Sequence, residues 1–224
     1  MELATILEKD DGLDFGESLL LEAKDLRKRD RTQSQIFSAG CRLLDRQSLV
    51  SLKVSAICRE AGIAHGTFYI YFPNRQEFVA SLLLRFVGYL QRIMHHAAKS
   101  GDTDTSRTTT HAYYKLFEQN AGLMKCLVNH LDEFPNSLEA FQKLNREWAT
   151  IVVNSTERKL ARSKKAGSIP RDELFRRAYA LGGMVDQYLT ALLLHHDQTL
   201  NAVSQDREAV IETLSLIWKR GMVQ

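Results

Sequence analysis

Apolar residues recur at spacings of three and four along most of the chain, which is the period of an α-helix. Helices are expected near residues 17–29, 32–45, 76–98, 111–119, 123–131, 137–162, 172–195 and 206–221, with two shorter ones in 51–72. Only three prolines interrupt 224 residues, and the polar run at 99–106 is the clearest internal loop. The pattern therefore predicts an all-α fold.

The stretch from Ser51 to Arg75 reads as two short helices and the start of a long one. Ser51 is expected to cap the first helix, and Gly62 to end it in a left-handed conformation. The second helix should begin near His65 and stop before Pro73, where Asn74 can cap the next helix. Two short helices joined by a glycine-containing turn are typical of a helix-turn-helix.

The helix before this motif is expected at 32–45, with Thr32 and Gln35 forming a capping box. It should bury one apolar stripe: Ile36, Phe37, Gly40, Leu43 and Leu44. These observations predict three regions, namely an acidic, flexible extension at 1–26, a helix-turn-helix domain at 27–76 and a helical regulatory and dimerisation domain at 77–224.

The second short helix carries side chains that suit the major groove of DNA. Phe68 and Phe72 can point together into a small core, so the other face is left outward. None of the outward residues is acidic, and a helix of this size fits the groove. The expected DNA-facing residues are His65, Gly66, Thr67, Tyr69 and Tyr71. A short helical hairpin inside an ordinary all-α domain is the alternative.

Charge is distributed unevenly along the chain. Residues 1–23 carry a net charge of −6, residues 24–75 carry +6, and the remainder carries +3. The basic segment coincides with the helix-turn-helix, where DNA phosphates would lie, although a solvated basic face is the alternative. The side chains expected on phosphates are Lys53, Arg75, Arg27, Lys28 and Arg29. A further hypothesis is that the acidic tail folds over this domain and competes with DNA.

The segment AGIAHGTFYIYFPNRQEF at 61–78 resembles the signature of the TetR family of bacterial transcriptional regulators. Seven positions match as they stand: Ala61, Gly62, Ile63, Gly66, Thr67, Tyr69 and Phe72. Four positions depart from it: Ala64 for Ser or Thr, His65 for Lys or Arg, Tyr71 for His, and Arg75 for Lys. The resemblance implies a helix-turn-helix regulator that binds double-stranded operator DNA, and most often represses transcription.

The resemblance also implies a homodimer and a small-molecule effector. In the family, the last two long helices pack on their symmetry mates, which here gives a predicted dimer interface of Leu181, Val185, Leu189, Val210, Leu214, Ile217 and Trp218. The apolar residues of both helices could instead be buried inside one subunit. The middle helices enclose a ligand pocket in the family, which places Tyr114, Phe117, Met124, Phe141, Asn145, Trp148, Met184 and Asp186 in it. Plain core packing is the alternative for most of these side chains.

Other classes of protein find little support in the sequence. No phosphate-binding loop, nucleophile elbow or HExxH motif occurs, so we expect no enzyme, no cofactor and no metal. The three cysteines show no metal or disulfide spacing, and a redox role for Cys126 is weaker than simple burial. No apolar run could span a membrane, and we expect a cytoplasmic protein. The alternative function is a helical small-molecule-binding or scaffold protein whose helix-turn-helix domain has lost sequence-specific DNA binding.

Overall fold

A computed structural model of the chain describes residues 12–99, 104–162 and 168–223. All regular structure in these ranges is helical, which confirms the all-α fold. The chain forms two compact units. Unit 1 comprises the chain up to Ile93 together with Lys115–Ala140, and unit 2 comprises Met94–Tyr114 together with the chain from Phe141 onward.

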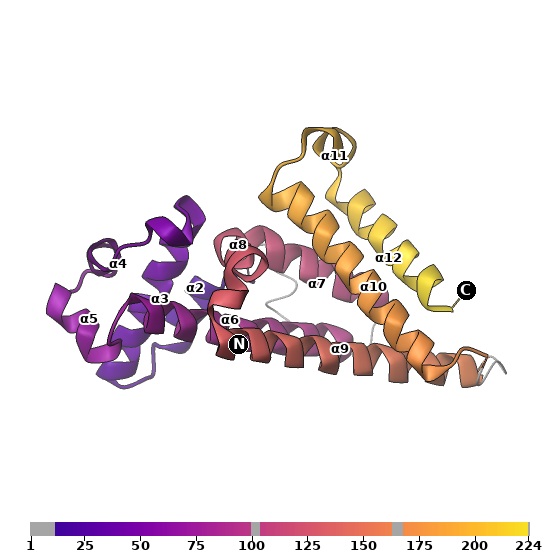
Figure 1. Cartoon of the computed structure of the whole chain (residues 1–224), viewed down its shortest axis with the longest axis horizontal. Helices are drawn as coiled ribbons and strands as arrows, with labels where there is room; N and C mark the ends of the chain where they lie inside the picture. The colour runs from indigo at the N-terminus through magenta and orange to yellow at the C-terminus, as the bar shows by residue number, and fades with distance from the viewer. Residues whose placement is uncertain (1–11, 100–103, 163–167, 224) are drawn as a thin grey trace. The chain divides into compact units, whose positions relative to one another are not determined.

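Unit 1 contains the helix-turn-helix and the helices that support it (Figure 1). Its complete helices are α2 (Phe15–Glu22), α3 (Lys28–Arg46), α4 (Val54–Ala61), α5 (His65–Tyr71) and α8 (Ala121–His130), with 3-10 turns at Leu49–Ser51 and Leu131–Glu133. Three longer helices run through both units: α6 (Arg75–Lys99), α7 (Thr105–Gln119) and α9 (Pro135–Arg162).

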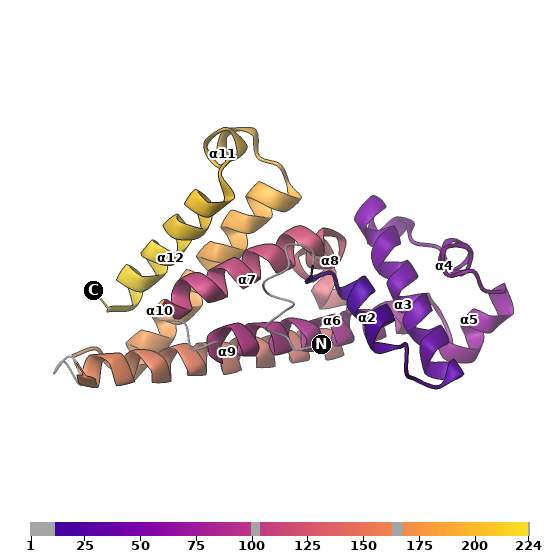
Figure 2. The same ribbon diagram turned by 180° about the vertical axis from the view of Figure 1, so that it is seen from behind.

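Unit 2 is completed by α10 (Arg171–Leu189), a π-helical turn at Thr190–Leu194, α11 (Gln198–Val203) and α12 (Arg207–Val223). Helices α10 and α12 lie side by side in both views (Figures 1 and 2). They share a core with α9 that consists of Ala149, Val153, Leu174, Ala178 and Met222. The sequence pattern predicted α10 as one helix to residue 195 and missed α11, whose N-cap is Asp197.

An aromatic cluster holds the helix-turn-helix together. The ring of Phe68 lies 5.5 Å from that of Phe72 and 5.7 Å from that of Phe78, and Phe37 of α3 lies 5.2 Å from Phe72. All four side chains are buried. Helix α3 accommodates this cluster through Gly40, because a Cβ there would stand 2.6 Å from the Phe78 ring. Burial of these rings fixes α5 against α3 and α6.

The predicted flexible extension is wrong at α2. Phe15 is buried with ring centroids 5.4 Å from Phe86 and 5.2 Å from Tyr89. The Asn120 side chain accepts a bond from the Phe15 backbone N–H (2.8 Å) and donates one to the Leu13 carbonyl (2.9 Å). These long-range contacts order a segment that has weak local periodicity. Residues 1–11, where the acidic-tail hypothesis is centred, lie outside the described residues.

The helix starts expected at Thr32 and Ser51 are wrong, whereas the predicted caps at Gly62 and Asn74 are confirmed. Helix α3 begins at Lys28, and Thr32 lies inside it with its hydroxyl donating to the Lys28 carbonyl (3.0 Å). Helix α4 begins after Lys53, because Ser51 belongs to a 3-10 turn. Gly62 ends α4 at φ 66°. Asn74 caps α6 by accepting the Glu77 backbone N–H at 2.9 Å.

Candidate functional site

The turn between α4 and α5 sets the angle at which α5 leaves the domain. Gly62 is left-handed, and the Ile63 N–H bonds back to the Cys58 carbonyl at 3.0 Å, which is a glycine-dependent helix ending. Cys58 is buried at the crossing. Helix α5 then begins at His65 after Ala64, which offers no side-chain cap.

Helix α5 buries one side and leaves the other open. Phe68 is fully buried, whereas His65, Gly66 and Tyr69 are exposed and Thr67 and Tyr71 are partly exposed. The His65 and Tyr69 rings lie edge to face, 5.3 Å apart. A Cβ on Gly66 would meet nothing within 4 Å, so this face is clear of protein. The five residues expected at the groove therefore all have some surface available.

An ion pair joins α4 to α3. The Arg42 Nε donates to Glu60 at 2.6 Å, and Arg46 approaches the same carboxylate at 3.7 Å. The hydrogen bond from Arg42 lowers the pKa of Glu60 below its usual range. The stabilisation from this pair is therefore present at neutral pH and is lost as acid protonates Glu60.

The predicted phosphate ligands fall into two groups. Lys53, Arg27, Lys28 and Arg29 have exposed side chains, and Arg27 and Lys53 stand at the N-termini of α3 and α4. Arg75 differs, because its Nη1 donates to the Leu49 carbonyl at 2.8 Å and lies 3.4 Å from the Leu52 carbonyl. Arg75 thus ties the 3-10 turn to the start of α6, a structural task that the sequence did not reveal.

Sequence reasoning missed two exposed apolar side chains in the same region. Ile70 on α5 is 69% exposed and Val50 before α4 is 78% exposed. Helical periodicity assigns apolar residues to a core, so it offers no signal for an isoleucine on the open face. Ile70 adjoins Tyr69 and adds an apolar surface to the open side of α5.

The residues predicted to form a ligand pocket belong to both units. Phe117 and Met124 belong to unit 1, and both are buried. The other six belong to unit 2: Tyr114, Phe141, Asn145, Trp148, Met184 and Asp186. Of the predicted set, Trp148 lines a cavity of about 340 Å³ within unit 2. The cavity is bounded by the end of α6, the first turns of α7, the second half of α9 and the last turns of α12.

Asp186 forms a polar pair with Tyr113, and both residues are half-buried. The Tyr113 hydroxyl donates to its carboxylate at 2.7 Å. Burial raises the pKa of Asp186 above its usual range, and the hydrogen bond from Tyr113 only partly opposes this shift. Burial, together with the nearby Asp186, also raises the pKa of Tyr113. Burial therefore disfavours the charged form of the Asp186 carboxyl group.

Replacing Asp186 with asparagine is expected to raise the melting temperature at pH 7.5. The folded chain binds a proton at Asp186 more readily than the unfolded chain, so its contribution is favourable in acid and is lost as pH rises. Asparagine keeps an acceptor for Tyr113 without the buried charge. Thermal melts of both proteins between pH 4 and 8 should show the difference shrinking in acid.

Asp186→Ala is the control for this experiment, because it removes both the charge and the acceptor. It should be less stable than the asparagine variant. A lower melting temperature for Asp186→Asn at pH 7.5 would show that the carboxylate is better stabilised than its burial indicates.

Four of the predicted dimer contacts are wrong, because they are core residues. Val185, Leu189, Val210 and Leu214 are all buried within the chain, so the alternative of burial inside one subunit holds for them. Trp218 packs against the unit 2 core, as does Leu181. Ile217 alone of the predicted set is exposed, at 42%.

The open sides of α10 and α12 carry a different apolar set. Tyr179, Leu216 and Ile217 are each more than 40% exposed. A Cβ on Gly183 would meet nothing within 4 Å, and Gly183 is itself exposed. A small residue on an open helix face permits another helix to approach closely. This set forms the exposed apolar surface of α10 and α12.

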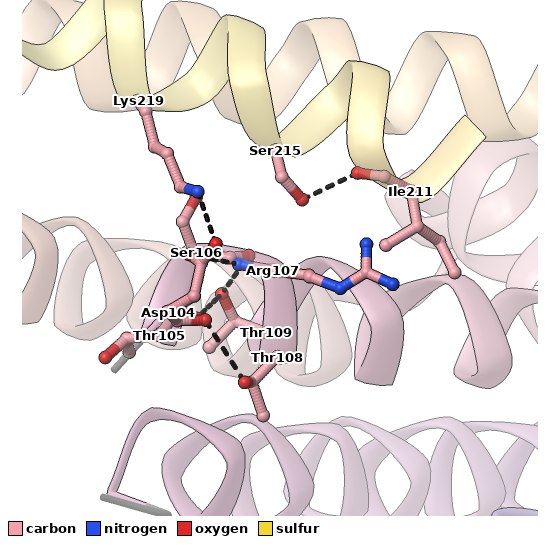
Figure 3. Close-up of polar contacts among 9 residues, drawn as sticks. All are labelled: Asp104, Thr105, Ser106, Arg107, Thr108, Thr109, Ile211, Ser215 and Lys219. Atoms are coloured by element: carbon pink, nitrogen blue, oxygen red, sulfur yellow. Dashed lines mark hydrogen bonds and ion pairs between the residues drawn. The ribbon is translucent and has the colours of Figure 1, made fainter. Parts of the chain in front are cut away.

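Ion pairs join the start of α7 to α12 (Figure 3). Asp104 accepts the α7 backbone N–H of Arg107 at 3.1 Å and also pairs with Lys219, which reaches down from α12. Burial alone would raise the pKa of Asp104, but the bonds from Lys219 and Arg107 outweigh it and lower that pKa. Arg107 forms a second ion pair with Glu208 of α12.

The remaining chemistry of the described residues is sparse. Within the described ranges, no three His, Cys, Asp or Glu side chains are grouped to hold a metal ion. None of the described helices combines the length and apolar character that crossing a bilayer requires. Cys126 is buried, and this burial raises the pKa of its thiol to about 12, which keeps it protonated and unreactive.

Comparison with known proteins agrees with this geometry. Residues 36–82 match the family model described as bacterial regulatory proteins, tetR family. The chain is 24% identical over 200 residues to the HTH-type transcriptional regulator EthR of Mycolicibacterium smegmatis, covering 84% of this chain and 85% of that protein.

Two solved structures show the same fold. The fatty acid degradation regulator FadR of Bacillus halodurans superposes with a TM-score of 0.66 at 16% identity, over 86% of this chain and 96% of that one. FadR of Bacillus subtilis, in complex with stearoyl-CoA, superposes with a TM-score of 0.61 at 17% identity. The match covers 84% of this chain and 97% of that one.

The protein combines a helix-turn-helix, whose second helix is open and non-acidic, with a further set of helices. These features define the class of DNA-binding transcriptional regulators. Its helix-turn-helix region, residues 36–82, is that of the TetR family of bacterial regulatory proteins. Regulators of this family bind operator DNA and small-molecule effectors, typically as dimers. The comparisons do not favour the alternative of a scaffold that has lost DNA binding.

Proposed function

We propose that this regulator is a cytoplasmic repressor that binds its operator as a homodimer and dissociates from it when a small molecule binds to the C-terminal helical domain. Residues 27–76 are assigned to DNA binding and residues 77–224 to regulation and dimerisation. The observation that carries the proposal is the open face of α5, which is held rigidly by the buried Phe68 beneath it.

The proposed DNA contacts divide by chemistry. His65, Gly66, Thr67 and Tyr69 would lie at the groove, because residues near the N-terminus of a recognition helix lie deepest in it. Thr67 would contact a base edge, and the Tyr69 hydroxyl would contact a phosphate. Ile70 would add an apolar contact, which suits the methyl group of thymine. Tyr71, Lys53 and Arg27–Arg29 would contact phosphates. Arg75 holds the 3-10 turn in place, and its remaining N–H groups are available to a phosphate.

The homodimer would form through the open sides of α10 and α12. Tyr179, Gly183, Leu216 and Ile217 offer an apolar surface with room for close helix approach. Two antiparallel helices facing their symmetry mates make a four-helix interface. Dimerisation supplies a second recognition helix, which a single seven-residue helix needs in order to read enough bases.

Release by an effector requires that the ligand bind one arrangement of the dimer better than another. FadR of Bacillus subtilis is described in complex with stearoyl-CoA, which makes an apolar or amphipathic effector a reasonable expectation for this chain. The cavity in unit 2 adjoins α12, so a ligand there would contact a helix of the proposed dimer interface.

Thr67→Ala is expected to relax base preference at one operator position. Tyr69→Phe should instead lower the binding affinity for all duplexes to the same extent. A single side-chain contact to a base discriminates by about 1 kcal/mol or slightly more, which corresponds to roughly fivefold to tenfold. Operator duplexes are first obtained by selection from random DNA. Binding of each variant is then measured by gel shift on the selected and on unselected duplexes.

The matched control is Thr199→Ala, since Thr199 is an exposed threonine on α11. It should leave binding to both kinds of duplex unchanged. If Thr67→Ala loses affinity equally on selected and unselected DNA, Thr67 does not read a base and its assignment is wrong.

A further inference from the structure

Both tryptophans of the chain line the cavity in unit 2. Trp148 stands on α9 and Trp218 on α12, and the sequence contains no other tryptophan. The apolar wall continues through Ile151, Val152, Met222 and Val223. Val152, Trp218 and Met222 also pack in the core of unit 2, so this wall is rigidly supported. Such a surface favours an apolar body in the ligand.

The charged residues that line the cavity are all cationic: Arg158, Lys159 and Lys219. Lys219 is already paired with Asp104 (Figure 3). The Arg158 Nε donates to the Asn154 carbonyl within its own helix at 3.2 Å. Neither Arg158 nor Lys159 pairs with a carboxylate in the part of the chain that the structure describes. Two exposed cations beside an apolar wall favour a ligand with an anionic end.

A buried hydroxyl supplies a second polar feature. Ser106, in the first turn of α7, is one of the residues that line the cavity. Its Oγ is inaccessible to solvent and makes no hydrogen bond within the described ranges. Buried polar atoms of native proteins usually have a partner, and an oxygen of a bound molecule would provide one once rotation of the Ser106 side chain turns this hydroxyl toward the cavity.

The size of the cavity limits the ligand further. A volume of about 340 Å³ lies near the lower end for small-molecule sites. At roughly 30 Å³ for each water-sized group, it accommodates on the order of eleven non-hydrogen atoms. A medium-chain or arylalkyl carboxylic acid fits this space.

We propose that this cavity binds a small organic carboxylate, with its apolar body against Trp148 and Trp218 and its carboxylate toward Arg158 and Lys159. The effector role of this ligand rests on the proposed function, since binding would act on α12 through Trp218. Another explanation for Lys159 is its position in the last turn of α9, where a cation complements the helix dipole. The two explanations predict different results for the same variant.

The test is a titration with octanoate followed by tryptophan emission. Because both tryptophans line the cavity, octanoate should change the emission in a saturable manner. The neutral analogue 1-octanol should bind at least about tenfold more weakly, since a charge-assisted hydrogen bond contributes roughly 1.5–3 kcal/mol. Acetate, which lacks the apolar body, should leave the emission unchanged.

The variant Arg158→Gln/Lys159→Gln should weaken octanoate binding about tenfold and leave octanol binding unchanged. The matched control is Arg146→Gln, because Arg146 is an exposed cation on the same helix and does not line the cavity. The inference is overturned if octanoate leaves the emission unchanged or binds no better than octanol. It is also overturned if the double variant lowers thermal stability without changing octanoate affinity.

Gel shifts on the selected operator separate this inference from the proposed function. Octanoate should release wild-type protein and should release the double variant only at about tenfold higher concentration. Operator binding without any effect of octanoate on emission contradicts the carboxylate site and leaves the repressor function standing. Emission changes without release from the operator would contradict the effector role of the site.

Discussion

Phe68→Ala is expected to destabilise the helix-turn-helix by about 3–5 kcal/mol, the usual cost of truncating a buried aromatic side chain. Phe68 is fully buried, and its ring contacts those of Phe72 and Phe78. It is also the one buried side chain of α5. The variant should lose DNA binding on every duplex, because α5 has no other anchor in the core.

The two tryptophans allow this loss to be localised. Both lie in unit 2, so their emission should report an unfolding transition close to that of wild type. Circular dichroism should instead show that part of the helix content of Phe68→Ala is lost at a lower temperature than in wild type. The control is Tyr69→Ala, which removes an exposed aromatic from the same helix and should change stability by less than about 0.5 kcal/mol. Equal melting of Phe68→Ala and wild type by both probes would contradict the described core.

Gly122→Ala is expected to destabilise the contact between α8 and α3 by about 2–3 kcal/mol, as overpacking does in a well-packed core. A Cβ at Gly122 would stand 2.4 Å from the Leu44 carbonyl carbon and 2.6 Å from the Asp45 nitrogen. These are backbone atoms, which cannot move aside as a side chain can. The displacement of α8 would also break the 3.0 Å bond from the Gly122 N–H to the Asp45 carboxylate.

Gly88→Ala is the matched control, because Gly88 is a glycine inside a helix of the same unit whose Cβ would meet nothing within 4 Å. Replacing such a glycine should stabilise the helix by up to about 1 kcal/mol. Denaturation curves of the two variants should therefore shift in opposite directions. Because α3 also supports α5, Gly122→Ala should weaken operator binding as well. A Gly122→Ala protein as stable as wild type would show that α8 does not rest on α3.

The helix-turn-helix could be predicted from the sequence because its boundaries depend on local signals. Gly62 supplies a left-handed residue, and Asn74 offers a side chain to a free N–H three residues away. Such signals act within one turn of helix, so a single sequence contains them. The cap expected at Ser51 was wrong because the preceding segment folds into a 3-10 turn. That turn is held by Arg75, which lies 26 residues from Leu49.

The placement of apolar stripes could not be predicted to the same degree. Helices α10 and α12 have apolar residues on more than one side, and the partners of each side decide which becomes core. Val185 and Leu214 are therefore buried while Tyr179 and Ile217 remain open. In the same way, α2 is ordered by Asn120, which lies more than 100 residues away from it. No local pattern contains that information.

The candidate ligand site shows the same limit. Aromatic and methionine residues on the middle helices predicted a pocket. Three of them, Tyr114, Phe117 and Met124, are buried core residues, and of the predicted set Trp148 lines the cavity of unit 2. The cations that accompany Trp148 lie ten and eleven positions further along α9, and in sequence they read as an ordinary solvated end of a helix. Their relation to Trp218 and Ser106 is produced by tertiary packing alone.

The central claim is that the protein binds DNA as a homodimer and that the open face of α5 in each subunit recognises the base sequence. Selection of the full chain from a pool of random duplexes tests this most directly. The account predicts enrichment of a palindrome whose half-sites are separated by about one helical turn, or a multiple of it, with the preference relaxed at one position by Thr67→Ala. A pool that remains random after repeated selection would contradict the account.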